Sequence, residues 1–141
     1  MYQTYNLSHT EALKIITTIQ AELEKQNKAA AIAVADSHGE LIAFLRLDGC
    51  KLPSLNIAIN KAFTAAREAA ESKVVGQRSR EEGFPMTNFG DLRYTAWGGG
   101  VPITYQGQVI GAVGVSGIPE AEDMAMAKLG VQAFEQMVSG Q

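Results

Sequence analysis

A chain of 141 residues, of which 46% are hydrophobic and 19% charged, has the size and composition of one domain with an apolar core. Its formal net charge at pH 7 is −3, which argues against nucleic-acid binding because that binding depends on a basic face. No apolar stretch approaches the roughly 20 residues that a membrane helix needs, and the N-terminus has no signal-peptide pattern. We therefore expect a single domain over residues 1–141 in the cytoplasm, where the one cysteine, Cys50, would stay reduced.

The first third of the chain predicts a helix followed by a β-hairpin. Ser8 and Glu11 have the spacing of a capping box, and the apolar residues after them recur at helical spacing to about Asn27. Two apolar runs, Ala30–Asp36 and Leu41–Leu47, flank a short turn. This pattern indicates two antiparallel strands.

A second helix is predicted from Leu55 to about Ser72, opened by Pro53 and Ser54. Its side chains are unusually small because six alanines lie on it: Ala58, Ala62, Ala65, Ala66, Ala69 and Ala70. Such a helix can approach a neighbouring element closely. Residues 76–91 then predict a short helix and a surface flap, and a further short strand is predicted from Arg93 to Trp97.

The C-terminal third predicts a second hairpin and a final helix. Strands are expected over Val101–Tyr105 and Gln108–Val115, joined by a tight turn at Gln106 and Gly107, and a helix begins at Pro119. The buried stripe of this helix is predicted to be Ala121, Ala125, Leu129, Ala133 and Met137. Because consecutive strands are joined by tight turns and pair antiparallel, the predicted fold class is α+β.

Glycines between Trp97 and Gly117 are the most informative feature of the chain. Glycine inside a strand costs stability and marks a place where something approaches the backbone closely. Strand alternation puts Ile110, Ala112, Gly114 and Ser116 on one face. Beyond Ile110 that face is small, so it leaves room either for a tightly packed helix or for a flat ligand.

Six motifs follow one another over nearly the whole chain, from about Leu7 to Met137. They are Val34-Ala35-Asp36 with Gly39, Arg46-Leu47-Asp48-Gly49, Ile59-Asn60-Lys61-Ala62 with Thr64-Ala65, Gly98-Gly99-Gly100-Val101-Pro102-Ile103, Gly107 with the stretch from Val109 to Gly117, and Asp123. Together they resemble the GlcG/HbpS family, a haem-degrading or haem-binding domain family that includes the C-terminal domain of PduO-type cobalamin adenosyltransferases.

The resemblance implies a profilin-like fold, in which helices flank a five-stranded antiparallel sheet, and assembly into homo-oligomers. It makes haem the implied cofactor, since some members bind it, whereas it implies no reaction common to the family. One segment departs from the family pattern. Glu71–Gly76 stands where many relatives carry a short Pro-Thr turn, so haem ligation in other members does not carry over through the flap that follows.

Seven residues are candidates for ligand binding: Lys61, Trp97, Gly98, Gly99, Gly100, Ser116 and Asp123. Lys61 either binds a carboxylate or lies at the edge of the buried stripe with its ammonium group in water. The three glycines either present backbone amides to an anion or form a sharp, closely packed bend. Trp97 either stacks on a planar ligand or lies in the core, and the core position is favoured. Asp123 either borders one cleft with Ser116 or complements the dipole of the last helix.

Metal and haem ligands have few candidates in this sequence. His9 and His38 are the only imidazoles, and both are expected to face solvent, one in the first turn of a helix and one in a hairpin turn. Met86 and Cys50 are the other candidate haem ligands. No pair of histidines has metal-ligand spacing, so no metal site is predicted.

Two classes of function fit these residues. The first is a small-molecule or haem-binding protein of the GlcG/HbpS type, accessory to a metabolic operon. The second is an enzyme acting on a small carboxylate or aromatic acid, in which Lys61 would anchor the anion and Asp123 would move a proton. Both place the ligand in a recess between the alanine-rich helix and the glycine-rich strand. The expected partners are a small-molecule ligand and further copies of the chain, with no nucleic acid and no membrane.

Overall fold

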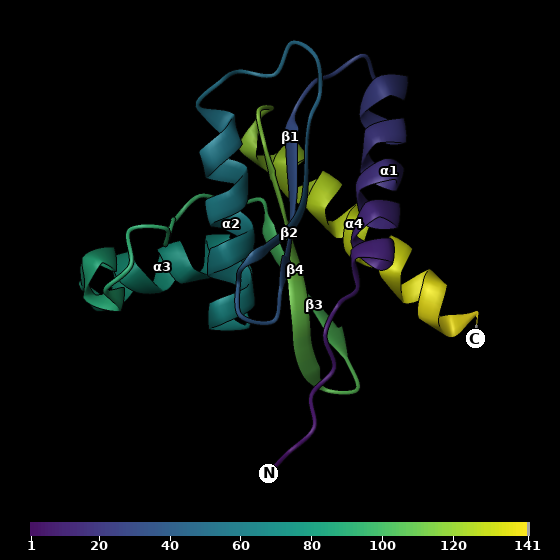
Figure 1. Ribbon diagram of the computed structural model, residues 1–141. Coiled ribbons are helices and arrows are strands. Elements are labelled where there is room, and N and C mark those ends of the chain that lie inside the picture. The colour runs from purple at the N-terminus through teal and green to yellow at the C-terminus, as the bar shows by residue number, and fades with distance from the viewer. Residues whose placement is uncertain (141) are drawn as a thin grey trace.

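The computed structural model describes residues 1–140, which form four α-helices, one 3₁₀ helix and four strands (Figure 1). In chain order these are α1 (His9–Lys25), β1 (Ala31–Asp36), β2 (Leu41–Arg46), α2 (Ser54–Glu68), α3 (Ser72–Glu82), η1 (Met86–Phe89), β3 (Gly100–Tyr105), β4 (Gln108–Ser116) and α4 (Glu120–Ser139). The strands form one sheet in the order β2-β1-β4-β3, with every neighbouring pair antiparallel. The predicted α+β class is confirmed.

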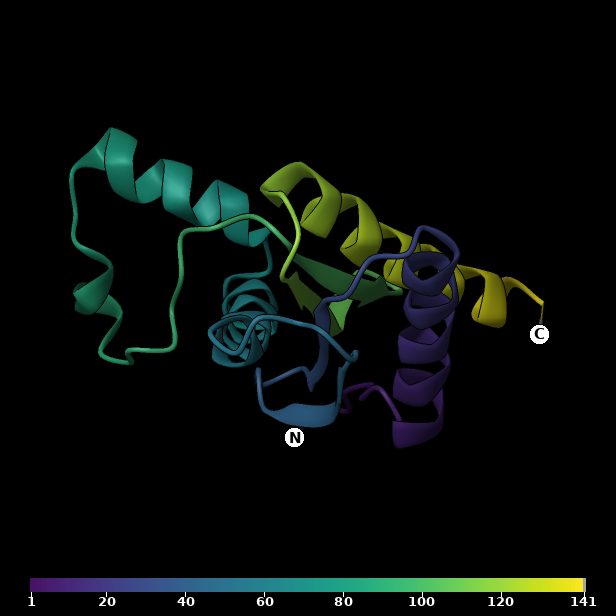
Figure 2. The ribbon, with the colours of Figure 1, turned by 90° about the horizontal axis from the view of Figure 1, so that it is seen from above.

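Helices cover both faces of this sheet. Helices α1 and α4 pack on one face and α2 on the other, whereas α3 and η1 extend sideways from the α2 side (Figures 1 and 2). The main apolar core lies between the sheet and the α1–α4 pair, and its fully buried side chains include Ile15, Ile19, Ile32 and Val113. No helix within residues 1–140 has the length and apolar character needed to cross a membrane.

Capping residues mark where α1 begins and where α2 and α3 end. The capping box forms as predicted, because the Glu11 amide donates to Ser8 Oγ at 3.2 Å and the Ser8 amide donates to the Glu11 carboxylate at 2.8 Å. Helix α2 ends at Glu68, earlier than predicted, because Ala69 takes a left-handed conformation with φ of 51°. Helix α3 then starts at Ser72 and ends where Gly83 has φ of 72°.

The sequence predicted a further strand from Arg93 to Trp97, and the family resemblance implied a five-stranded sheet. Both predictions are wrong for the described residues, whose sheet has four strands. This segment is a loop whose backbone groups bond to helix side chains instead of to a strand. The Thr95 amide donates to Thr64 Oγ1 at 3.0 Å, and Ser72 Oγ donates to the Trp97 carbonyl at 2.7 Å. The loop is therefore fastened to α2 and to the start of α3.

The small face of β4 packs directly on α2. A Cβ atom built on Gly114 would lie 2.1 Å from the Ala58 carbonyl oxygen, and one on Gly100 would lie 2.2 Å from the Lys61 carbonyl oxygen. The expected recess between the alanine-rich helix and the glycine-rich strand is therefore wrong. Glycine is required at these two positions because the helix backbone occupies the space of a side chain.

Ile110 does not share the face of Ala112, as strand alternation predicted. The pairing of β3 with β4 shifts between Ile103, which lies opposite Gly111, and Thr104, which lies opposite Val109. This bulge turns Ile110 to the other face, where it belongs to the α1–α4 core.

Helix α4 buries a different stripe from the predicted one. Its buried residues are Asp123, Met126, Ala127, Gly130 and Phe134, whereas Ala121 and Ala125 are exposed. The predicted stripe was wrong because the face that α4 buries contains a carboxylate, Asp123, and a glycine, Gly130, and a pattern of apolar residues includes neither. Gly130 is needed there because a Cβ atom would lie 2.7 Å from Ile19 Cδ1 of α1.

Candidate ligand-binding cleft

A cleft of about 800 Å³ opens where the end of β4 and the start of α4 meet α2 and α3. Its charged lining residues are Lys51, Lys61, Lys73, Arg80, Glu120 and Asp123, and its apolar lining residues include Ile57, Ala96, Trp97, Ile118 and Pro119. The cleft lies beside Trp97, at one end of the α2–sheet contact, and not inside that contact where the recess was predicted. Ser116, the last residue of β4, also lines it.

The floor of the cleft contains a buried ion pair between Lys61 of α2 and Asp123 of α4. Lys61 Nζ lies 3.1 Å from Asp123 Oδ2 and donates to the Val115 carbonyl at 2.9 Å. The Ile118 amide donates to Asp123 Oδ1 at 3.3 Å. Lys61 is 2% exposed and Asp123 4%, so the sequence interpretation that put the Lys61 ammonium in water is wrong.

Burial affects the ionisation of Asp123. Desolvation raises the pKa of the Asp123 carboxyl, and the Lys61 charge and hydrogen bond oppose that rise. An ammonium group carries three hydrogens, and the residues that the structure describes accept two of those of Lys61. Because Lys61 lines the cleft, its third hydrogen is the one that a bound molecule could accept.

The three glycines before β3 let the loop pass close to Lys61. Gly99 has φ of 126°, and a Cβ atom there would lie 2.5 Å from the Val115 carbonyl oxygen and 2.9 Å from Lys61 Nζ. The Gly98 amide donates to Glu120 Oε2 at 2.8 Å, and the Gly100 amide donates to Ser72 Oγ at 2.9 Å. Two of the three amides are thus used inside the protein, which favours the sharp-bend interpretation over an anion cradle.

Trp97 is 59% exposed and lines the cleft, so the favoured core position is wrong. Its backbone is held, since the carbonyl accepts from Ser72 Oγ and the next residue, Gly98, is buried. Fixing the backbone in this way leaves the indole ring on the surface beside the cleft. An exposed aromatic ring at the edge of a cleft offers a flat apolar surface to a ligand.

A second ion pair connects the two rims of the cleft. Lys73 of α3 lies 2.5 Å from Glu120 of α4, and Glu120 also accepts the Gly98 amide. The Lys73 hydrogen bond and then the Gly98 hydrogen bond hold the pKa of Glu120 below its usual value. The other two cations of the lining, Lys51 and Arg80, form no ion pair within residues 1–140.

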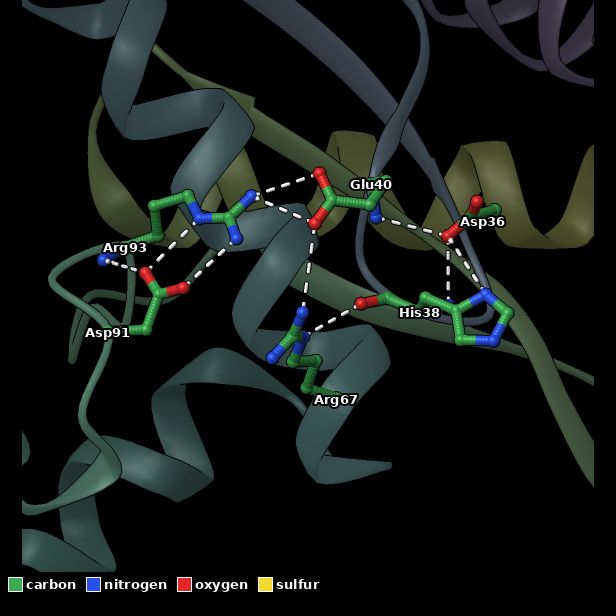
Figure 3. Close-up of polar contacts among 6 residues, drawn as sticks. All are labelled: Asp36, His38, Glu40, Arg67, Asp91 and Arg93. Atoms are coloured by element: carbon green, nitrogen blue, oxygen red, sulfur yellow. Dashed lines mark hydrogen bonds and ion pairs between the residues drawn. The ribbon is translucent and has the colours of Figure 1, made fainter.

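The loop that carries Trp97 is also fastened at its N-terminal end (Figure 3). Arg93 bonds to Asp91 at 2.9 Å and to Glu40, in the β1–β2 turn, at 3.1 Å. Arg67 of α2 lies 3.6 Å from Glu40 and donates to the His38 carbonyl at 2.8 Å. These contacts join the loop, the hairpin turn and α2.

Both arginines of this network also lie over the same aromatic ring, that of Phe63. The guanidinium carbons of Arg93 and Arg67 lie 3.9 Å and 4.5 Å from the ring centroid of Phe63. Tyr94 packs edge-on against Phe63 and stacks on Phe89 of η1. Sequence reasoning missed this cluster, because Glu40 and Arg93 are 53 residues apart and no local spacing connects them.

The candidate haem ligands do not line the cleft. His9 opens α1, His38 lies in the β1–β2 turn with Nδ1 3.9 Å from Asp36, and Met86 opens η1. Cys50 precedes Lys51, and burial raises the pKa of its thiol. No cluster of three or more His, Cys, Asp or Glu residues in the described part of the chain could hold a metal ion.

Comparison with known protein families assigns most of the chain to one of them. Residues 7–132 match the family described as "Haem degrading protein HbpS-like". The chain belongs to this family, which confirms the resemblance predicted from the six motifs.

Individual relatives agree with this assignment. The chain is 39% identical over 116 residues to protein GlcG of Escherichia coli K12, covering 78% of this chain and 81% of GlcG. A crystal structure of a double mutant of HbpS from Streptomyces reticuli superposes with a TM-score of 0.84 at 27% identity, covering 94% of this chain and 89% of that one. A PduOC–haem complex has the same fold, with a TM-score of 0.82 at 20% identity over 92% of this chain and 95% of that one.

Proposed function

We propose that this protein binds a small organic anion in the cleft beside Trp97. The observation that carries the proposal is the charge of the lining. Four cationic and two anionic side chains line the cleft, whereas the chain as a whole has a net charge of −3. A positive cleft in an acidic protein attracts anionic ligands and raises their local concentration.

The individual side chains suggest which kind of anion fits. Of the four cations that line the cleft, Lys51 and Arg80 form no ion pair within residues 1–140, so they are free to meet acid groups. Trp97, Ile57 and Ile118 supply an apolar surface between them. A carboxylate attached to an aromatic ring, or a dicarboxylate of similar size, matches both features.

Haem is the ligand that the family description suggests, and the cleft fits only part of it. The cations of the lining could pair with the carboxylates of haem, and Trp97 could stack on the porphyrin ring. Haem iron is held by His, Cys, Met or Tyr side chains, and none of these is among the described residues that line the cleft. The cleft residues therefore do not fit iron-ligated haem, and a haem-binding role for this protein would need an iron ligand from outside the cleft.

The ligand can be identified by the fluorescence of Trp97, the only tryptophan of the chain. We would titrate the protein with aliphatic and aromatic mono- and dicarboxylates, and separately with haemin followed by absorbance. Binding of one carboxylate should change the fluorescence and weaken at least tenfold in Arg80→Ala. Arg78→Ala is the matched control, since Arg78 is exposed on the same helix and does not line the cleft. No fluorescence change with any carboxylate at millimolar concentration would end the proposal.

A second candidate function, proton transfer on the bound acid, is favoured by the raised pKa of Asp123 at the cleft. Lys61 would then anchor the anion and Asp123 would move the proton. The test compares turnover of each bound carboxylate by the wild type and by Asp123→Asn. Turnover lost in the variant supports the enzyme; turnover that survives it, or a wild type without turnover, contradicts it.

The remaining expectations extend this proposal. Helix–sheet–helix layering and the strand order β2-β1-β4-β3 support a profilin-like domain spanning residues 1–141. We propose that it works as a homo-oligomer, as the family resemblance implies, and as an accessory to the products of a metabolic operon. Its free thiol, Cys50, is compatible with the reducing cytoplasm.

A further inference from the structure

The buried hydroxyl groups of the described structure differ in whether the fold uses them. They belong to Ser54, Thr64, Ser72 and Ser116. Thr64 and Ser72 each donate to one backbone carbonyl and accept one backbone amide. These bonds hold the loop that carries Trp97, so both hydroxyls have a structural role. Ser54 and Ser116 line the cleft instead.

Ser116 is the buried hydroxyl that has no partner. It is 4% exposed, and its Oγ forms no hydrogen bond within residues 1–140. Ser54, by contrast, lies beside the Cys50 thiol, and its hydroxyl opposes the rise in the pKa of that thiol. No fully buried side-chain nitrogen or oxygen in the described part of the chain lacks a partner. The unpaired Ser116 oxygen therefore reaches the cleft that Ser116 lines.

Lys61 offers a second hydrogen-bonding group next to Ser116. Its ammonium group donates to the carbonyl of Val115, the residue before Ser116, and to the Asp123 carboxylate, which leaves one hydrogen. An ammonium group only donates, whereas a serine hydroxyl both donates and accepts. A ligand hydroxyl can use both groups, because it can accept from Lys61 and donate to Ser116.

The charge of the cleft floor favours a neutral group over a second acid. Lys61 and Asp123 are buried 3.1 Å apart, so their charges largely cancel. A carboxylate placed there would lose its water and face the Asp123 carboxylate. Arg80 lies on the outer part of the cleft, two turns after Lys73 and about 10 Å farther along α3. The acid group of a ligand is therefore best placed at Arg80, with a neutral oxygen at the floor.

We propose that the ligand is an aromatic acid whose ring carries a hydroxyl group opposite the acid group, and that Ser116 and Lys61 bind this hydroxyl. The inference rests on the proposed binding of an organic anion in the cleft and adds the feature that selects among such anions. Trp97 contacts the ring between the two ends. A site built to bind a ligand hydroxyl rejects the analogue without it, because its buried polar groups are left unpaired.

Calorimetric titration with three acids tests the position of the hydroxyl: benzoate, 2-hydroxybenzoate and 4-hydroxybenzoate. The dissociation constant of 4-hydroxybenzoate should be lower than that of benzoate by about tenfold or more, and that of 2-hydroxybenzoate by no more than about threefold. In Ser116→Ala the preference for 4-hydroxybenzoate should fall to about threefold or less, with benzoate binding unchanged. Ser139→Ala should keep the full preference, since Ser139 is exposed near the end of α4 and does not line the cleft.

The wild-type comparison does not depend on any variant folding. Equal binding of benzoate and 4-hydroxybenzoate would overturn the inference, as would a preference that survives in Ser116→Ala. An aliphatic carboxylate that binds while none of the three benzoates does would overturn it too. Each of these results leaves the proposed anion site in place. If no carboxylate binds at millimolar concentration, the proposed function fails together with the inference.

Discussion

Lys61 and Asp123 form a 3.1 Å ion pair that is almost completely removed from solvent. The pair joins α2 to α4, which lie on opposite faces of the sheet, around the end of β4 where Lys61 also donates to the Val115 carbonyl. A buried charge without its partner is strongly unfavourable, whereas an apolar pair of similar volume often costs little. The contact therefore makes the two helices interdependent in stability.

Lys61→Met should lower the free energy of unfolding by about 3–5 kcal/mol, because it leaves the Asp123 carboxylate unpaired in a buried site. The double variant Lys61→Met with Asp123→Leu should lose much less than the two single variants together. Urea unfolding followed by circular dichroism measures all three. Lys128→Ala, which removes an exposed pair with Glu71 at 3.8 Å, should change stability by no more than about 1 kcal/mol. Additive losses in the double variant would contradict the role of the pair.

Gly114→Ala should destabilise the fold by about 1–3 kcal/mol or more, because the added methyl group would meet the Ala58 carbonyl oxygen at 2.1 Å. Helix α2 would have to move away from β4. Gly107→Asn is the control, since Gly107 has open space around it and a φ of 77° that Asn tolerates. Thermal unfolding of both variants makes the comparison. A stable Gly114→Ala variant would mean that α2 does not lie against β4 as described.

Arg93→Ala should loosen the loop that carries Trp97, because Arg93 bonds to both Asp91 and Glu40 and covers one face of Phe63. We expect faster proteolytic cleavage within residues 86–97 and greater quenching of Trp97 fluorescence by acrylamide. Arg93→Lys should restore little, since an ammonium group cannot reproduce the planar, two-sided hydrogen bonding of the guanidinium. Arg78→Ala serves as the control. An unchanged cleavage rate in Arg93→Ala would contradict this expectation, because it would show that the loop stays ordered without the Arg93 contacts.

The Glu120 carboxylate should stabilise the fold in a pH-dependent way. Its pKa is held below the ordinary value of 4.5 by Lys73 and the Gly98 amide. A group whose pKa is lower in the folded state contributes stability above its unfolded pKa and loses that contribution as pH falls through the folded pKa. The Tm difference between the wild type and Glu120→Gln should therefore be constant near neutral pH and shrink below pH 4.5. Glu135→Gln, on the exposed face of the same helix, is the reference; a difference that grows on acidification would contradict the expectation.

Elements set by local signals were predictable from the sequence. The capping box at Ser8, the apolar runs of β1 and β2 and the tight turn before β4 each depend on residues a few positions apart. The loop from Arg93 to Trp97 was misassigned as a strand because its backbone partners, Thr64 and Ser72, lie on helices distant in sequence. Propensity alone does not record such contacts.

The candidate site was predictable as a set of residues but not as an arrangement. Lys61 and Asp123 were both singled out, yet their pairing across 62 positions is visible only in the fold. The buried face of α4 was missed because a polarity pattern counts Asp123 as exposed. Ile110 was assigned to the wrong face because a bulge, which no residue type announces, breaks the alternation of β4.

The loop bearing Trp97 is held by Arg93 at one end and by Ser72 and Glu120 at the other. The loop beside the indole ring is therefore already ordered in the conformation that a ligand would contact. Such preorganisation spares the entropy of ordering a flap on complex formation, so encounter should proceed at a speed governed by diffusion and charge steering, without a preceding isomerisation.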